Sequence, residues 1–156
     1  QLIGTLAYMS PEQVGAAPHI DARSDVYSLG VMLYQLLASR MPLVLDDRSI
    51  ADAVRAIQEA EPAGVGTIDT RLRGDVDTIV SRAIAKDRSR RYQSAALLAE
   101  DIRNFLRGEP IEARRDSALY MLRKTLRRYR WAVAASLVLV LGLIVFSLYA
   151  GVQANR

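Results

Sequence analysis

The chain has 156 residues, which is enough for one modest domain with additional segments. It has no cysteine and a single histidine, His19, which excludes disulfides, thiolate metal sites and multi-histidine metal sites. The formal net charge of +4 is unevenly distributed: residues 1–108 carry 13 basic and 14 acidic residues, and residues 109–156 carry 8 and 3. Because the chain begins with Gln1 rather than Met, we expect a fragment or a processed protein.

The first distinctive string is GTLAYMSPEQV, at residues 4–14. It joins a turn-prone Gly-Thr pair to a short apolar run and a Ser-Pro-Glu triplet. No cysteine, metal-ligand cluster or nucleophile–base pair accompanies it. Taken alone, the string is specific in appearance but does not define a reaction.

A helix is predicted over residues 24–39, with Ser24 as its N-cap and Asp25 in its first turn. Its apolar residues surround the helix axis, which is typical of a central helix that is buried on all sides. Pro42 ends it. A buried Asp25 would need hydrogen bonds, for which the backbone N–H groups of a neighbouring loop are candidates. An ordinary surface helix cap is the alternative.

Three further helices are predicted from apolar residues at helical spacing, over residues 49–60, 75–87 and 94–108. Residues 63–74 are predicted to form a loop. The sequence contains no alternating strand pattern and no internal repeat. Residues 1–108 are therefore predicted to form a mainly α-helical assembly around one central helix.

Residues 109–130 form a basic segment. It places cations between apolar residues at helical spacing, namely Leu119, Leu122, Leu126 and Tyr129. This pattern predicts a juxtamembrane helix near anionic lipid headgroups, and a solvated basic linker is the alternative. Nucleic acid is not an expected partner, because an uncharged apolar run follows directly.

That run, residues 131–152, predicts a single transmembrane helix. At about 1.5 Å per residue it would be about 33 Å long, and a hydrocarbon core is about 30 Å thick. Trp131 and Tyr149 lie near its ends, where interfacial aromatic residues are favoured. A buried core helix is the alternative. The excess of Arg and Lys before the run places residues 1–130 in the cytoplasm and residues 153–156 on the extracytoplasmic side of a plasma or inner membrane.

Three strings occur in an order and spacing that resemble the C-terminal lobe of bacterial receptor-like Ser/Thr protein kinases. They are GTLAYMSPEQ, DARSDVYSLGVMLYQLL and KDRSRRYQSA. The resemblance covers residues 1–108 and implies the C-terminal lobe of a protein-kinase-like fold, which is α+β when complete. Ser10 stands where the family more often has Ala, and MPL follows the central helix in place of the more usual Pro-Phe.

The resemblance implies a role for each matched position. Ser10, Pro11 and Glu12 match the signature that closes the activation segment. Gly4, Thr5 and Tyr8 match the loop that receives the protein substrate near its acceptor residue, and Thr5 would help to orient the catalytic aspartate.

The other matched positions are structural. The resemblance implies that Glu12 pairs with Arg91, that Asp25 holds the catalytic loop through its backbone amides, and that Gly30 is the family glycine of the central helix. From the residues alone, the alternatives are two surface charges for Glu12 and Arg91, and a simple helix cap for Asp25.

The chemical machinery of phosphoryl transfer was not found in the sequence. The reaction needs a Gly-rich loop, a nucleotide-binding lysine, a catalytic Asp with an Asn, and an Mg²⁺-binding Asp. The string HID at residues 19–21 lacks the arginine of a catalytic loop, GVG at residues 64–66 is no phosphate loop, and Asp-Phe-Gly is absent. We expect no catalytic, cofactor-binding or metal-binding residue in this chain, and we assign ATP and Mg²⁺ to a longer parent protein.

The sequence-based hypothesis is a fragment of a membrane-anchored Ser/Thr protein kinase that is inactive alone. Its expected partners are protein substrates, the lipid bilayer and a second kinase molecule in a homodimer. The alternative hypothesis is a membrane-anchored pseudokinase or helical docking module without catalysis.

Overall fold

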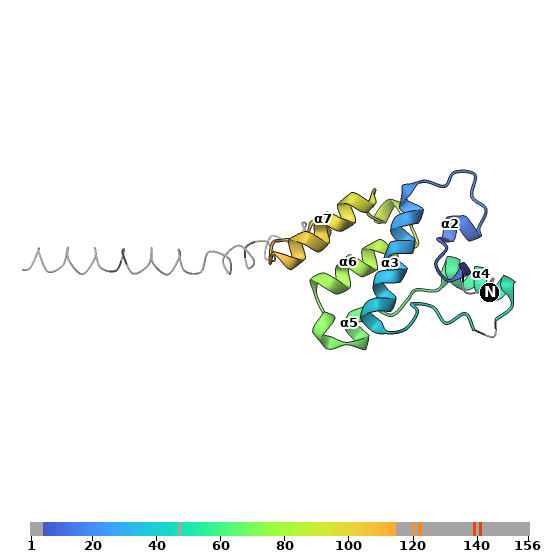
Figure 1. Ribbon diagram of the computed structural model, residues 1–156, viewed down its shortest axis with the longest axis horizontal. Helices are drawn as coiled ribbons and strands as arrows, with labels where there is room; N and C mark the ends of the chain where they lie inside the picture. Colours follow the sequence, from blue (N-terminus) through green and yellow to red (C-terminus); the bar gives the residue numbers. More distant parts are fainter. Residues whose placement is uncertain are drawn as a thin grey trace, which may run out of the picture.

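The computed structural model describes residues 5–46 and 48–114, together with residues 120, 122, 139 and 141. Over these residues the chain is mainly helical and contains no strand (Figure 1). The α-helices are α2 (Pro11–Val14), α3 (Ala22–Ala38), α4 (Ile50–Glu59), α5 (Val65–Ile68), α6 (Asp75–Ala83) and α7 (Ala95–Leu106). Three short 3₁₀ helices connect or follow them: η1 (Thr70–Leu72), η2 (Arg88–Arg90) and η3 (Glu112–Arg114).

Helix α3 is the element on which the others pack. It contacts α5, α6 and α7, and α2 lies beside α4 (Figure 1). Its N-cap is Asp21, whose side chain accepts a hydrogen bond of 2.9 Å from the backbone N–H of Arg23. The prediction that Ser24 is the N-cap is wrong. Asp21 caps the helix three residues earlier, and Ser24 is buried in the first turn of the helix.

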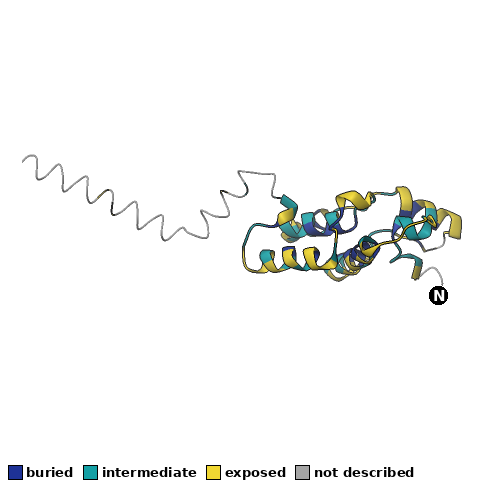
Figure 2. Ribbon diagram, turned by 90° about the horizontal axis from the view of Figure 1, so that it is seen from above, coloured by how far each residue is buried: buried dark blue, intermediate teal, exposed yellow. Residues whose placement is uncertain are grey.

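The prediction that this helix is buried on all sides is also wrong. Leu29, Met32 and Leu36 are 39%, 42% and 80% exposed, and they follow one another at helical spacing along one face of α3. Figure 2 shows such exposed stretches beside buried ones along the helices. The reason is that α5, α6 and α7 contact α3, while no described element covers the stripe of Leu29, Met32 and Leu36.

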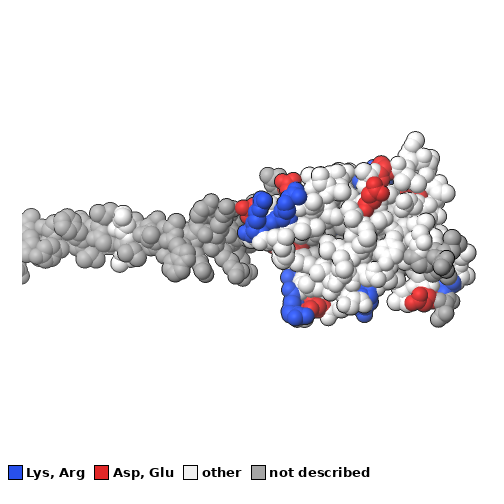
Figure 3. Space-filling view, viewed as in Figure 1, with Lys and Arg blue, Asp and Glu red and all other residues white. Residues whose placement is uncertain are grey.

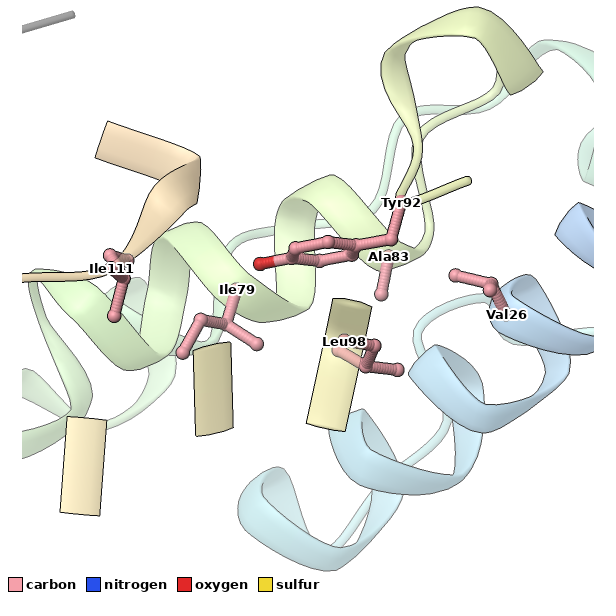
Figure 4. Packing of buried hydrophobic residues seen from close by; sticks show 6 residues of the cluster. All are labelled: Val26, Ile79, Ala83, Tyr92, Leu98 and Ile111. Carbon is pink, nitrogen blue, oxygen red and sulfur yellow. The ribbon is translucent and has the colours of Figure 1, made fainter. Parts of the chain in front are cut away.

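Two of the hydrophobic clusters meet along α3. The first joins α3, α6 and α7 to the segments that precede and follow α7 (Figure 4), and consists of Val26, Ile79, Ala83, Tyr92, Leu98 and Ile111. The second lies between α3, α5 and α6, and consists of Tyr27, Val31, Tyr34, Val65, Val80 and Ile84. A third cluster holds α4 in place and consists of Leu45, Ala53, Ala56 and Ile57.

The predicted loop over residues 63–74 contains α5 and η1 instead. Local hydrogen bonds stabilise these short helices: the Asp69 side chain accepts from the backbone N–H of Arg71 at 2.9 Å, and Asp77 accepts from Gly66 N–H at 3.0 Å. Neither helix is long enough to produce a repeating apolar pattern, so periodicity could not reveal them.

The predicted fold also needs a correction at its C-terminal end. Within the part of the chain that the structure describes, no helix combines the length and the apolar character needed to cross a membrane. The longest of these helices, α3, has 17 residues and carries Arg23 and Asp25 in its first turns. The expected transmembrane helix, residues 131–152, lies outside the described residues except for Leu139 and Leu141. The expected membrane location rested on that helix.

Gly30 allows α3 and α6 to approach each other closely. A Cβ atom at this position would lie 2.7 Å from the Cβ of Ala83 and 2.8 Å from Cγ2 of Ile84. Real Cβ atoms do not tolerate such distances, so any side chain here forces the two helices apart.

We therefore predict that Gly30→Ala lowers the free energy of unfolding by about 1–3 kcal/mol, the usual cost of overpacking a core. Chemical denaturation followed by circular dichroism measures this difference. The control is Leu36→Ala on the exposed side of the same helix, which should change stability much less. Equal stability of Gly30→Ala and the unmodified chain would contradict the close packing.

Candidate functional site

The Ser-Pro-Glu triplet forms the start of α2. Ser10 is buried, and its backbone N–H donates a hydrogen bond of 2.8 Å to the side-chain oxygen of Gln13. Pro11 occupies the first turn, where a helix does not need the backbone N–H that proline lacks. This local arrangement fixes the direction in which the next residue, Glu12, extends its side chain.

Glu12 forms a two-pronged ion pair with Arg91, which follows it by 79 residues. Arg91 Nη1 donates to Oε1 at 2.6 Å, and Nη2 donates to Oε2 at 2.9 Å. The Arg91 side chain is 0% exposed and that of Glu12 is 9% exposed. The pair is therefore buried, a setting in which removing one partner leaves a costly unpaired charge.

The rest of the Arg91 guanidinium is bonded to backbone oxygens. Nε donates to Ala85 O at 2.6 Å, Nη1 donates to Arg23 O at 3.2 Å, and Nη2 donates to Lys86 O at 3.0 Å. With the two bonds to Glu12, these account for the five N–H groups that a guanidinium possesses. The group also lies over the Tyr27 ring, 5.0 Å from its centroid. Arg91 thus joins α2, the start of α3 and the segment between α6 and η2.

Ser24 supports the same carboxylate by donating from Oγ to Glu12 Oε1 at 2.7 Å. Burial pushes the pKa of Glu12 upward, but the hydrogen bonds from Arg91 and Ser24 outweigh this and lower it from 4.5 to about 2. Sequence reasoning missed this role of Ser24. A serine at a helix start is an ordinary N-cap signal, and nothing in the string points to a carboxylate twelve residues earlier.

Lys86 is another residue whose role sequence reasoning missed. Its Nζ donates to Ile57 O at 2.7 Å, at the C-terminal end of α4, and lies 5.8 Å from the centroid of the Tyr27 ring. Burial lowers the pKa of Lys86 to about 8 and raises that of Tyr27 to about 12. Lys86 and Arg91 therefore contact the same aromatic ring, and Lys86 connects that ring to α4.

The predicted substrate-side loop lies between α4 and α3. Gly4 is outside the described residues, and Thr5 is exposed. Tyr8 is fastened to α3 at two points: its carbonyl accepts from Ser28 Oγ at 2.8 Å, and its hydroxyl donates to Gln35 Oε1 at 2.7 Å. Its loop is thus held against the exposed part of α3.

The structure does not bring every predicted site residue into this cluster. Asp25 follows Ser24 directly, but its side chain is exposed, and no hydrogen bond or ion pair joins that side chain to the described part of the chain. Gly30 lies on the side of α3 that faces α6. The structure therefore joins Ser10, Pro11, Glu12 and Arg91, connects Tyr8 to them through α3, and leaves Asp25 pointing to solvent.

Metal binding and ion pairing both depend on the charged side chains of the described residues. Among residues 5–46 and 48–114, no group of three or more His, Asp or Glu side chains could hold a metal ion. On the face shown in Figure 3, the blue and red side chains lie mostly near the margin and in pairs. Two pairs are local, Arg23 with Asp21 and Arg71 with Asp69, and they shift the pKa of each aspartate downward.

Comparison with known proteins agrees with the motif order. The family model described as "Protein kinase domain" matches residues 1–102. A probable serine/threonine-protein kinase of Streptomyces coelicolor is 42% identical over 112 residues, which are 72% of this chain and 16% of that protein. Serine/threonine-protein kinase PknB of Mycobacterium tuberculosis is 39% identical over 112 residues, which are 72% of this chain and 17% of that protein. The chain spans less than a fifth of the length of these relatives.

The lowered pKa of Glu12 makes stability depend on pH in a defined direction. A carboxyl whose pKa falls from 4.5 in the unfolded chain to about 2 in the folded chain stabilises the fold above pH 4.5, and this contribution is lost as the pH falls toward 2. We therefore predict that the unfolding free energy of the unmodified chain falls more steeply between about pH 5 and about pH 3 than that of Glu12→Gln. Urea denaturation at both pH values measures the difference. Parallel pH dependence in the two proteins would contradict it.

Proposed function

Because the chain belongs to the protein kinase family, we propose that it is the substrate-side part of a bacterial Ser/Thr protein kinase. The parent protein would transfer the γ-phosphate of ATP to Ser or Thr side chains of protein substrates in signalling. The observation that carries this proposal is the buried Glu12–Arg91 pair, since it fixes the end of the segment for which the motif resemblance implies a substrate-side role.

Positioning explains why such a pair matters for phosphoryl transfer. In this reaction the protein mainly orients the reactants and stabilises charge, and small displacements of the acceptor are costly. Arg91 holds Glu12, and Ser28 and Gln35 hold Tyr8, so the segment from Tyr8 to Glu12 is attached at both ends to the helical scaffold. In the proposal, this segment shapes the site that receives the substrate, and Thr5 helps to orient the catalytic aspartate.

Asp25 has a separate role in the proposal. Its exposed position, with no partner in the described part of the chain, suits a carboxylate that accepts backbone amides from another part of the kinase. ATP and Mg²⁺ would be held by residues of the parent protein that this chain does not supply. Among the described residues no group of three or more His, Asp or Glu side chains could hold a metal ion, and we expect that the chain alone does not transfer phosphate.

A kinase assay on the parent protein tests this function. We predict that the purified parent protein, with ATP and Mg²⁺, places phosphate on Ser or Thr of a protein substrate, as detected by mass spectrometry. Glu12→Gln should lower kcat/KM about 100-fold, the scale expected when an acceptor segment is displaced by about 1 Å. Arg55→Ala is the control, because Arg55 forms only an exposed pair with Glu59.

Two outcomes would contradict the proposal. Phosphate transfer by the 156-residue chain alone would place catalytic machinery where we assign none. A parent protein that folds but transfers no phosphate would favour the alternative, a docking module that binds partners without catalysis.

A further inference from the structure

The segment after α7 packs into the lobe. We call residues 109–114 the strap. Ile111 is buried in the same cluster as Val26, Ile79 and Leu98 (Figure 4), although it lies beyond the residues that the family model matches. Glu109 N–H donates to Asn104 O at 2.8 Å, which turns the chain back toward α7. The strap is therefore an integral part of the core.

One buried carboxylate holds the strap. Asp101 of α7 is completely buried, and it accepts from the backbone N–H of Glu112 at 2.6 Å and from that of Ala113 at 2.9 Å. The third donor is the hydroxyl of Tyr92, at 2.8 Å. A buried carboxylate is strongly unfavourable unless such donors satisfy it, so strap, Asp101 and Tyr92 stabilise one another.

The end of the strap is attached separately. Arg114 Nη1 lies 3.2 Å from Asp75 Oδ1 at the start of α6, and its guanidinium lies over the Tyr120 ring at 4.6 Å. The Tyr120 hydroxyl accepts from Ile111 N–H at 3.1 Å. These contacts attach the end of the strap to α6 and to Tyr120.

Tyr92 connects this cluster to the Glu12–Arg91 pair. Tyr92 and Arg91 are adjacent in the chain, but Arg91 extends toward Glu12, whereas the Tyr92 hydroxyl extends toward Asp101. In Figure 4 the Tyr92 ring lies near Ile79 and Ala83, with its oxygen directed toward the side where Ile111 lies. Both side chains are buried, so a displacement of this two-residue segment must affect both sets of hydrogen bonds.

We propose that the strap and the substrate-side segment are energetically coupled through Asp101, Tyr92, Arg91 and Glu12. Loosening the strap weakens the placement of Arg91, and weakening the Glu12–Arg91 pair loosens the strap, because such coupling is reciprocal. A mechanical force, a covalent modification or a binding partner that acts on the chain beyond residue 114 would then change the placement of the segment at Glu12. The coupling itself does not require kinase activity, so its test and that of the proposed function fail separately.

Hydrogen exchange in the full 156-residue chain, followed by NMR, tests the coupling. Asp101→Asn keeps the shape of the side chain and removes its charge. We predict faster exchange at the strap amides of Glu112 and Ala113, and also at the Arg91 Nε–H and the α2 amides of Gln13 and Val14. The increase at the distant sites should be about 2- to 30-fold, the range that couplings of this kind produce.

The matched control is Asp69→Asn. Asp69 also accepts a backbone N–H, from Arg71, but it lies at η1 and contacts neither the strap nor Tyr92. This variant should leave exchange at the strap and at α2 unchanged.

The variant Tyr92→Phe distinguishes coupling through this hydrogen-bond network from a general loss of stability, because it removes only the hydroxyl that donates to Asp101. In a Tyr92→Phe background, Asp101→Asn should still accelerate strap exchange but should add nothing at Arg91 Nε–H or α2. The inference is overturned if Asp101→Asn loosens the strap without affecting those sites, or if its effect on them is the same in both backgrounds. If Asp101→Asn fails to fold, Tyr92→Phe alone decides, since it must accelerate exchange at Arg91 Nε–H to support the coupling.

Discussion

The structure depends on the need to satisfy one buried cation. The Arg91 guanidinium is fully removed from solvent, and each of its N–H groups therefore requires an acceptor. Glu12 supplies two oxygens, and the carbonyls of Ala85, Lys86 and Arg23 supply the others. Segments that are distant in the sequence must meet at this point, because any one that moved away would leave part of the charge unpaired.

The sides of helix α3 have different roles. One side packs on α5, α6 and α7 through the clusters that contain Val26 and Tyr27. The beginning of the helix contributes Ser24 to the Glu12 carboxylate, and Ser28 and Gln35 hold Tyr8. The remaining side presents Asp25 and the stripe of Leu29, Met32 and Leu36 to solvent. A single helix thus carries the core, the substrate-side segment and an open surface.

The sequence predicts those elements whose apolar residues repeat at helical spacing. For this reason the predicted bounds of three helices agree with those of α4, α6 and α7 to within a few residues. Periodicity could not place α5 or η1, because local hydrogen bonds of Asp69 and Asp77 stabilise them. Sequence reasoning placed the N-cap at Ser24, although Asp21 caps the helix, because both residue types are common N-caps and the contact of Ser24 with Glu12 exists only in the folded chain.

The candidate site was less predictable than the helices. Motif order suggested the partnership of Glu12 with Arg91, but the roles of Ser24, Lys86 and Asp101 depend on contacts between segments that no local pattern encodes. The same limit applies to residues 109–114, which belong to the basic segment of residues 109–130 that is predicted from the sequence to be juxtamembrane. Burial of Ile111 and two backbone hydrogen bonds to Asp101 make this segment part of the core.

The central claim is that the Glu12–Arg91 pair itself, and not the two residues separately, fastens the substrate-side segment to the lobe. A double-mutant cycle with Glu12→Gln, Arg91→Met and the combined variant, measured by chemical denaturation at neutral pH, tests this claim most directly. We predict a coupling free energy of about 1.5–3 kcal/mol, in the upper part of the range for residues in contact. Effects that add to within about 0.5 kcal/mol would show that the pair does not act as a unit and would contradict the account.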